Sequence, residues 1–357
     1  MTFDWAIVGG VICGSLAGGA ARFGRLCTMS AIEDALVARD FRGAKAWGLA
    51  LAVAIAVTQV AQFFGVIDLG RNPYTGPHVH LFGSALGGLV FGLGMTLVGT
   101  CSFGLLVRAG GGDLRAAVGA LFVGVFAFAV TAGLLAPLRT PLLSIGAVTT
   151  TSANGLSILT LLGQLLGPAA ARWTVAFGTI ILVFMAVADN RLRQRPRLIA
   201  GSIILGLTVA TGWWTTSRAV EDLTLDRVES LSFVAPVGRA LLQFMIEPFR
   251  NPGFGVSAML ATAFASFAVA AWRGELRWEA FDDAIEMRRH LFGAALMGIG
   301  GVLAHGCTIG QGMSAASTLA VSAPIFTLAV LIGAKLGLRH LIEGRSLWRI
   351  GHPAHGS

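Results

Sequence analysis

The stretch HLFGSALGGLVFGLGMTLVGTCSFGLLVRAGGG, residues 80–112, has a second copy in HLFGAALMGIGGVLAHGCTIGQG, residues 290–312. Both copies open with His-Leu-Phe-Gly, continue with Ala-Leu and glycine-rich apolar sequence, and reach a cysteine set among glycines. This cysteine is Cys101 in the first copy and Cys307 in the second. Because more than half of the chain separates them, we expect two internal repeats that determine the architecture.

The apolar run of the second copy is short. It lasts from Leu291 to about Ala304 before Gly306-Cys307-Thr308 interrupts it. A membrane-spanning helix needs about 20 apolar residues, so a run of about 10–14 predicts a half-spanning, re-entrant segment. Glycine weakens helices and lets the main chain approach a ligand closely. Interrupted helices at corresponding positions of two repeats are a sequence indication of a transporter's binding site.

The composition predicts a membrane protein. The chain is 55% hydrophobic and 12% charged, with a mean hydropathy of +0.76, whereas soluble domains carry about 25% charged residues. We expect an all-α polytopic fold of about eight to ten spans plus several half-spanning helices, with Leu156–Leu166 and Leu291–Ala304 too short to span. The clear apolar runs are Trp5–Ala21, Ala46–Ile67, Leu81–Val98, Ala116–Leu138, Trp173–Ala188, Leu198–Trp214, Val256–Trp272 and Leu319–Leu338.

The two repeats predict one transmembrane domain. It covers residues 1–357, with repeat one at about 1–190 and repeat two at about 197–345. We find no segment large enough to form a soluble domain.

The net charge of +8 fits basic residues that flank spans on the cytoplasmic side better than a nucleic-acid surface. The densest cluster is Arg191–Arg197, and basic residues also follow the first hairpin and occupy Arg339–Arg349. The positive-inside rule therefore predicts an external N-terminus and an internal C-terminus.

The sequence offers no motif for a cofactor or a catalytic set. The four cysteines form no CxxC pair, and no Ser/His/Asp set, Walker loop or dinucleotide fingerprint is present. His80 and His290 are equivalent by repeat, but a metal site needs further histidines or carboxylates nearby. A helix-start or interface role fits them better. Three roles stay open for His305: it tunes the site beside Cys307, it packs against its neighbours, or it hydrogen-bonds a freed carbonyl.

The cysteines have two interpretations. A lone buried cysteine, such as Cys13 within the first apolar run, usually packs in the core as a small apolar side chain. The equivalence of Cys101 and Cys307 favours sulfur ligands instead. A thiol is a weak donor and a polarizable acceptor, and the N-termini of half-helices supply positive potential and free N–H groups. Together these groups suit an anion that carries soft sulfur.

These motifs resemble the YeeE/YedE (TsuA-like) sulfur-transport family of bacterial thiosulfate transporters over nearly the whole chain. An N-terminal Arg and Cys match Arg22 and Cys27, and the later Gly-Cys-x-x-Gly-x-Gly motif matches Gly306, Cys307, Gly310 and Gly312. The first motif matches Gly92, Gly94, Met95, Gly99, Cys101, Gly104, Arg108, Gly110 and Gly112. Many members have Gly-Gly-Cys at this site, whereas this chain has Thr100 in place of the second glycine.

The resemblance implies a bundle built from inverted repeats, with several half-spanning helices, in the bacterial inner membrane. It also implies that this multi-pass protein takes up thiosulfate or a related inorganic sulfur anion. Its partners are membrane lipid and a small TusA-like sulfur-carrier protein on the cytoplasmic side. The implied pathway residues are Cys27, Cys101, Cys307, Gly99, Thr100, Gly104, Gly306 and Gly310. Two alternatives remain open: a membrane sulfurtransferase that uses a cysteine persulfide, and a transporter of a selenium compound.

Overall fold

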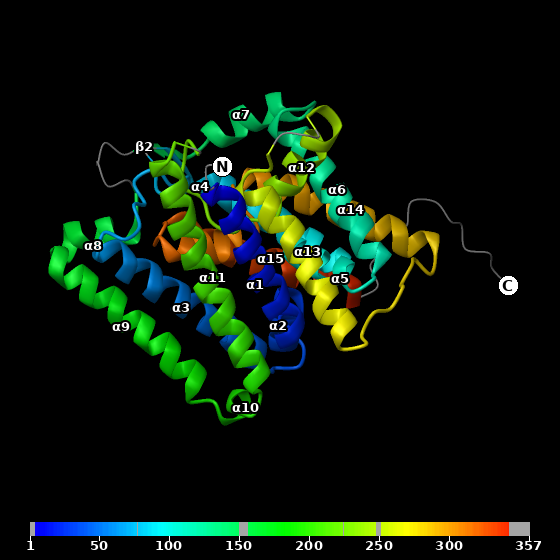
Figure 1. The fold of residues 1–357 in the computed structure, drawn as a ribbon, viewed down its shortest axis with the longest axis horizontal. Helices are drawn as coiled ribbons and strands as arrows, with labels where there is room; N and C mark the ends of the chain where they lie inside the picture. The colour runs from blue at the N-terminus through cyan, green and yellow to red at the C-terminus, as the bar shows by residue number, and fades with distance from the viewer. Residues whose placement is uncertain (1–3, 77, 150–155, 224, 248–250, 343–357) are drawn as a thin grey trace.

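The computed structural model describes all residues except 1–3, 77, 150–155, 224, 248–250 and 343–357 (Figure 1). Most of the basic segment Arg339–Arg349 therefore lies outside the described residues. The described chain is almost entirely helical. Its helices are α1 (Trp5–Gly24), α2 (Thr28–Leu36), α3 (Arg42–Phe63), α4 (Leu81–Val98), α5 (Ser102–Gly110), α6 (Leu114–Thr131), α7 (Ala136–Ser144), α8 (Ile158–Leu166), α9 (Pro168–Val187), α10 (Asn190–Arg193), α11 (Pro196–Glu221), α12 (Ala235–Ile246), α13 (Phe254–Trp272), α14 (Ala284–Leu303), the π-helix η1 (Gly310–Ala315) and α15 (Ser322–Ile342).

Two short strands complete the described structure. β1 (His78–His80) pairs antiparallel with β2 (Ala147–Thr149), so that Val79 lies opposite Val148. This ribbon lies against the start of α4, where His80 leads directly into Leu81. It therefore holds one end of the long central helix.

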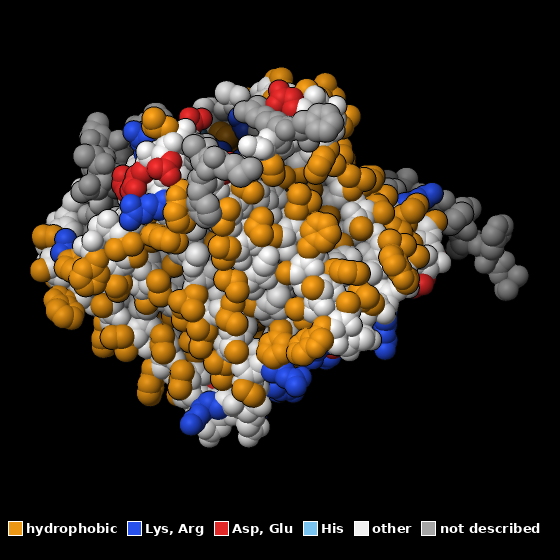
Figure 2. All heavy atoms as spheres, viewed as in Figure 1, with side chains coloured by type: hydrophobic (Ala, Val, Ile, Leu, Met, Phe, Trp, Pro, Cys, Tyr) orange, Lys and Arg blue, Asp and Glu red, His pale blue; other side chains and the backbone are white. Residues whose placement is uncertain are grey.

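The all-α polytopic architecture is confirmed. Within the described residues, eight helical segments are long and apolar enough to cross a membrane. Apolar side chains cover a broad belt of the molecular surface, and basic side chains gather at its lower edge (Figure 2). Such a belt suits the hydrocarbon core of a bilayer, which is about 30 Å thick.

Small residues allow the central helices to pack closely. A Cβ at Gly87 of α4 would lie 2.5 Å from the carbonyl oxygen of Gly300 in α14, and a Cβ at Gly300 would lie 2.6 Å from that of Gly87. Further along, Gly94 meets Gly293, so α4 and α14 run in opposite directions. Close backbone contact at glycines is a usual way to associate helices in lipid. The opposed directions are those that inverted repeats require, and the repeat relation and its bounds stay predictions.

The short apolar run Leu291–Ala304 is part of a longer helix, and this helix is not among the eight segments that are long and apolar enough to cross a membrane. These residues form the second part of α14, a complete 20-residue helix that begins at Ala284. At 1.5 Å per residue it is about 30 Å long. The hydropathy pattern missed its first turns because they carry Glu286, Arg288 and Arg289. The short helices follow the cysteines instead: α2 after Cys27 and α5 after Cys101 are nine residues each.

Candidate functional site

Three of the four cysteines stand where a short helix begins. Cys27 is the N-cap of α2, and Cys101 is the N-cap of α5. The Cys101 sulfur accepts a hydrogen bond from the amide of Gly104 at 3.4 Å, and the Cys307 sulfur accepts one from the amide of Gly310, also at 3.4 Å. Cys101 and Cys307 thus share the same local geometry in the two halves of the chain. Cys27 makes no such capping bond, so its sulfur is not engaged by its own helix.

A hydroxyl side chain follows each of these cysteines, namely Thr28, Ser102 and Thr308. The first two segments contact each other in a crossed arrangement. Thr28 Oγ1 lies 3.7 Å from the sulfur of Cys101, and the sulfur of Cys27 lies 3.9 Å from Thr100 Oγ1. Residues far apart in the sequence therefore form one cluster of alternating thiols and hydroxyls.

The third segment joins the same cluster. Thr308 lies beside the sulfur of Cys101, and Cys307 is also near enough to Cys101 to act on it electrostatically. The hydroxyl of Ser102 is buried and has no hydrogen-bond partner among the described residues, whereas the buried hydroxyl of Thr308 has the sulfur of Cys101 beside it. A buried hydroxyl without a partner loses about 1–3 kcal/mol, so it is satisfied when a ligand supplies the missing bond.

Helix ends add positive potential to the cluster. The first turn of a helix leaves main-chain N–H groups without partners and carries about half a positive charge. After Cys307 the chain winds as the π-helix η1, in which Ser314 N donates to Ile309 O over five residues, at 2.8 Å. Such turns are frequent at functional sites. The cluster combines thiols, hydroxyls and helix N-termini, which is a set of groups that binds an anion.

Four glycines allow the main chain to turn tightly around the cysteines. Gly99 ends α4 in the left-handed region, with φ 81°, a conformation that favours glycine. A Cβ at Gly104 would lie 2.1 Å from Thr100 Oγ1, one at Gly306 would lie 2.8 Å from the amide nitrogen of Gln311, and one at Gly310 would lie 2.9 Å from Ser232 Oγ. These positions need glycine to shape the turns around the cysteines. Their approach to a bound ion remains a proposal.

Other site residues carried no sequence signal. Tyr74 is buried, and its hydroxyl oxygen would lie 3.4 Å from a Cβ at Gly310. Phe103 of α5 packs against Phe233 with ring centroids 4.8 Å apart. Both aromatic contacts join segments from different halves of the chain, so only the tertiary structure reveals them. Cys13 is fully buried within α1, which agrees with a packing role.

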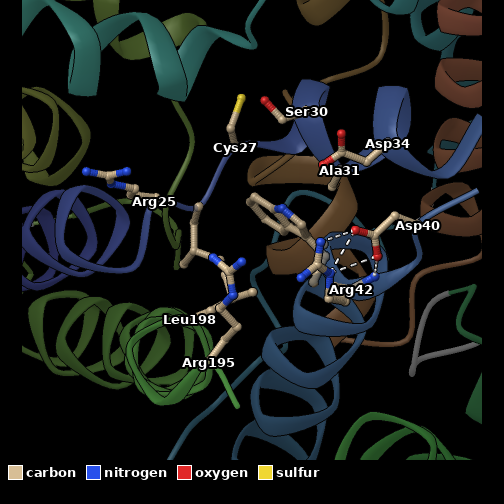
Figure 3. Close-up of a pocket in the computed structure, with 12 residues that line it drawn as sticks. Arg25, Cys27, Ser30, Ala31, Asp34, Asp40, Arg42, Arg195 and Leu198 are labelled. Atoms are coloured by element: carbon tan, nitrogen blue, oxygen red, sulfur yellow. Dashed lines mark hydrogen bonds and ion pairs between the residues drawn. The ribbon is translucent and has the colours of Figure 1, made fainter. Parts of the chain in front are cut away.

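A cavity of about 150 Å³ lies on the other side of Cys27. Arg25, Arg42 and Arg195 line it together with Cys27, Ser30 and Trp47, and the sulfur of Cys27 points to one edge of it (Figure 3). Arg42 is paired with Asp40, and Asp34 also lines the cavity. The indole N–H of Trp47 is buried and finds no hydrogen-bond partner within the described part of the chain.

The fold and the site define a multi-pass membrane protein in which thiols and hydroxyls from three segments of the chain lie together. A family model described as sulphur transport matches residues 23–336, and the chain belongs to this sulphur transport family. The thiosulfate transporter TsuA of Spirochaeta thermophila is 26% identical over 332 residues, covering 91% of this chain and 96% of the relative. The thiosulfate transporter TsuA of Escherichia coli is 27% identical over 324 residues, covering 86% of each chain. The bacterial relatives and the eight apolar segments place the protein in the inner membrane.

Proposed function

We propose that the protein takes up thiosulfate, or a closely related inorganic sulfur anion, through a narrow pathway lined by cysteine thiols. The observation that carries the proposal is the crossed contact of Cys27 and Thr28 with Thr100 and Cys101, with Thr308 beside it. The names of the two relatives supply the substrate. Gly99, Gly104, Gly306 and Gly310 shape the turns that hold these groups in place.

In this proposal the anion moves stepwise from Cys307 to Cys101 and then to Cys27. The thiols stay protonated and donate S–H groups, because a thiolate beside a buried dianion would add like-charge repulsion that nothing compensates. The hydroxyls of Ser102 and Thr308 bind the oxygen atoms of the anion. Several weak sites in series let the ion leave as readily as it enters.

The cavity beside Cys27 is the inner end of this pathway. The arginines that line it, and the neighbouring Arg191 and Lys45, belong to the basic segments that the positive-inside rule places in the cytoplasm. We infer an internal C-terminus on the same grounds. A small TusA-like sulfur-carrier protein is the proposed partner on this side, where it receives the anion that leaves the cavity.

The test is uptake of labelled thiosulfate in a strain that lacks other sulfur importers. Cys101→Ala and Cys307→Ala should abolish uptake, because each removes a ligand that the pathway cannot bypass. The serine variants should keep low activity, since a hydroxyl still donates but lacks sulfur's softness. Cys13→Ala, whose sulfur is buried within α1, is the matched control. Full uptake by both alanine variants at normal membrane levels contradicts the proposal.

Two rival functions give different outcomes. A membrane sulfurtransferase would form a cysteine persulfide, which mass spectrometry of the protein incubated with thiosulfate detects as one added sulfur atom. Uptake of a labelled selenium compound in preference to thiosulfate would change the substrate but leave the pathway intact. Retained label inside the cells, with no persulfide on the protein, supports transport.

A further inference from the structure

Two hydroxyl groups converge on the glycine whose amide contacts the sulfur of Cys307. The amide of Gly310 donates to this sulfur at 3.4 Å. The ideal Cβ position of the same glycine lies 2.9 Å from Ser232 Oγ and 3.4 Å from the hydroxyl oxygen of Tyr74. Because glycine has no side chain, residue 310 itself places nothing between these hydroxyls and the turn that holds Cys307. Tyr74, Ser232 and Gly310 form what we call the hydroxyl collar of Cys307.

Tyr74 is held in place by both its main chain and its ring. Its amide donates to Asn72 Oδ1 at 2.9 Å, and Asn72 Nδ2 donates to the carbonyl oxygen of Leu69 at 2.6 Å. Its ring meets the fully buried ring of Trp213 edge to face, with centroids 6.2 Å apart. Trp213 Nε1 in turn donates to Ser317 Oγ at 3.0 Å. The position of the Tyr74 hydroxyl is thus fixed before a ligand arrives.

The hydroxyl of Tyr74 is not used to hold the protein together. Tyr74 is only 6% exposed, and a buried tyrosine usually places its O–H on an acceptor. Among the described residues, none forms a hydrogen bond with the hydroxyl of Tyr74 or with that of Ser232. A rigid, enclosed donor without a protein partner is a typical feature of a ligand site.

The collar approaches Cys307 from the side of the membrane opposite the basic cavity beside Cys27. Helices α3 and α11 both begin at basic segments that the positive-inside rule places in the cytoplasm. α11 has 26 residues and is about 39 Å long, and α3 has 22 residues and is about 33 Å long, so each ends at the other face. Tyr74 follows α3, and Ser232 follows α11. The two hydroxyls therefore meet where an anion arrives from outside.

The charges near the collar favour an anion. Arg227 and Arg239 act electrostatically on Tyr74, together with Glu229 and Cys307. Glu229 pairs with Arg239 at 3.6 Å. Since the Cys307 thiol carries its proton in the proposed pathway, two cations face one carboxylate. This surplus of positive charge raises the local concentration of anions at the collar.

We propose that Tyr74 and Ser232 bind the oxygen atoms of the sulfur anion as it enters, and so turn its terminal sulfur atom toward Cys307. Each hydroxyl donates one hydrogen bond to an oxygen atom, and the Cys307 thiol donates to the terminal sulfur. The step transfers no proton and breaks no covalent bond. The proposal rests on the proposed function, because it takes the same anion, and it adds the groups that bind this anion before the first thiol.

Tyr74 is the only tyrosine of the chain, so its hydroxyl can be observed directly. Incorporation of meta-fluorotyrosine places one fluorine atom next to this hydroxyl, and fluorine NMR of the protein in detergent then gives a single protein resonance. Titration with thiosulfate should shift the resonance in a saturable manner, whereas potassium chloride at equal ionic strength should not. Gly310→Ala should weaken the shift, because its methyl group would occupy the position on which the two hydroxyls converge.

Uptake of labelled thiosulfate into proteoliposomes tests the same contacts. Tyr74→Phe removes only the hydroxyl and keeps the ring against Trp213, so it should raise KM about tenfold or more with a nearly unchanged maximal rate. Ser232→Ala should have the same effect. Thr211→Val in α11 is the matched control and should keep the parental KM, because its hydroxyl donates to Leu207 of the same helix at 3.0 Å. Tyr74→Phe should unfold at the parental temperature, since the hydroxyl has no partner among the described residues.

A saturable fluorine shift together with the raised KM supports the collar. A resonance that thiosulfate does not move while uptake by the parent saturates, or a parental KM in both Tyr74→Phe and Ser232→Ala, overturns the collar and leaves the proposed function intact. Absence of thiosulfate uptake in the parent overturns the proposed function, and a saturable fluorine shift would then still support an anion site at Tyr74. The fluorine measurement uses the parent sequence, so it stays decisive even if Tyr74→Phe unfolds at a lower temperature.

Discussion

The contact between Thr100 and Gly104 provides a sharp test of how the site is built. A Cβ at position 104 would lie 2.1 Å from Thr100 Oγ1, but 3.4 Å from Thr100 Cβ and 3.8 Å from the Cys101 sulfur. Only the first distance is shorter than atoms allow, so the whole clash falls on one hydroxyl oxygen. Overpacking of this kind costs about 1–3 kcal/mol. Gly104→Ala should therefore lower the unfolding temperature and turn the Thr100 hydroxyl away from Cys27.

Thr100→Ala should rescue the substitution at position 104. Without Oγ1 the remaining contacts of the new methyl group are ordinary, so the double variant should be about as stable as Thr100→Ala alone. The coupling free energy in this double-mutant cycle should be about 1–3 kcal/mol, because it equals the relieved clash. Thr100→Ala alone should raise KM for thiosulfate roughly tenfold or more, because a hydrogen bond to a charged group contributes about 1.5–3 kcal/mol.

The assay is thermal unfolding of the parent, both single variants and the double variant in detergent, with uptake measured in parallel. Gly178→Ala in α9 is the matched control, because a Cβ there meets nothing within 4 Å. If Gly104→Ala unfolds at the parental temperature, or if Thr100→Ala does not relieve it, the fit of these two residues is not what shapes the turn. If Thr100→Ala leaves KM unchanged, the hydroxyl is not a ligand.

Three further predictions concern other parts of the chain. Gly306→Val should abolish uptake while the protein reaches the membrane at a normal level. The reason is that the new side chain would displace the amide nitrogen of Gln311, which lies 2.8 Å from the Cβ position. Uptake at the native rate would show that this glycine motif serves only helix packing. With the protein in detergent, a maleimide should alkylate the partly exposed Cys27 faster than Cys101 or Cys307, which are 1% and 0% exposed, and saturating thiosulfate should slow the reaction. Equal rates for all three thiols would argue against the described burial. Asp113 lies outside the spans; burial raises the pKa of its carboxyl, but the Arg108 charge and the hydrogen bond from the Ala116 amide outweigh this, so the net pKa is lowered. Its stabilising contribution is thus present above about pH 4, the ordinary range of aspartate, and is lost as the pH falls. Asp113→Asn keeps the N-cap of α6 but should lower the free energy of unfolding by about 1–2 kcal/mol near pH 7 and by little in acid. Unfolding temperatures measured across pH test this, and an equal loss of stability at every pH would refute it.

Much of the architecture follows from local sequence. Long apolar runs can satisfy their main-chain groups in lipid only as helices, so composition and run length already predict an all-α polytopic protein. The same reasoning found only the apolar part of α14, because the charged first turns of this helix lie outside any apolar window although they belong to the same helix. Hydropathy detects where a helix meets lipid, whereas hydrogen bonding determines where it begins.

The repeated motif identified Cys101 and Cys307, and the resemblance to the family added Cys27, but neither could show which groups meet. The contacts of Thr28 with Cys101, and of Cys27 with Thr100, join segments more than 70 residues apart. The stacking of His80 on His305 joins the two copies of the motif. Such contacts depend on how helices from different parts of the chain pack, and glycine pairs such as Gly87 and Gly300 set that packing. The sequence alone thus determined the membrane fold and the candidate thiols, whereas the tertiary structure decided which hydroxyls and imidazoles surround them, because side chains distant along the chain become neighbours only when the helices pack.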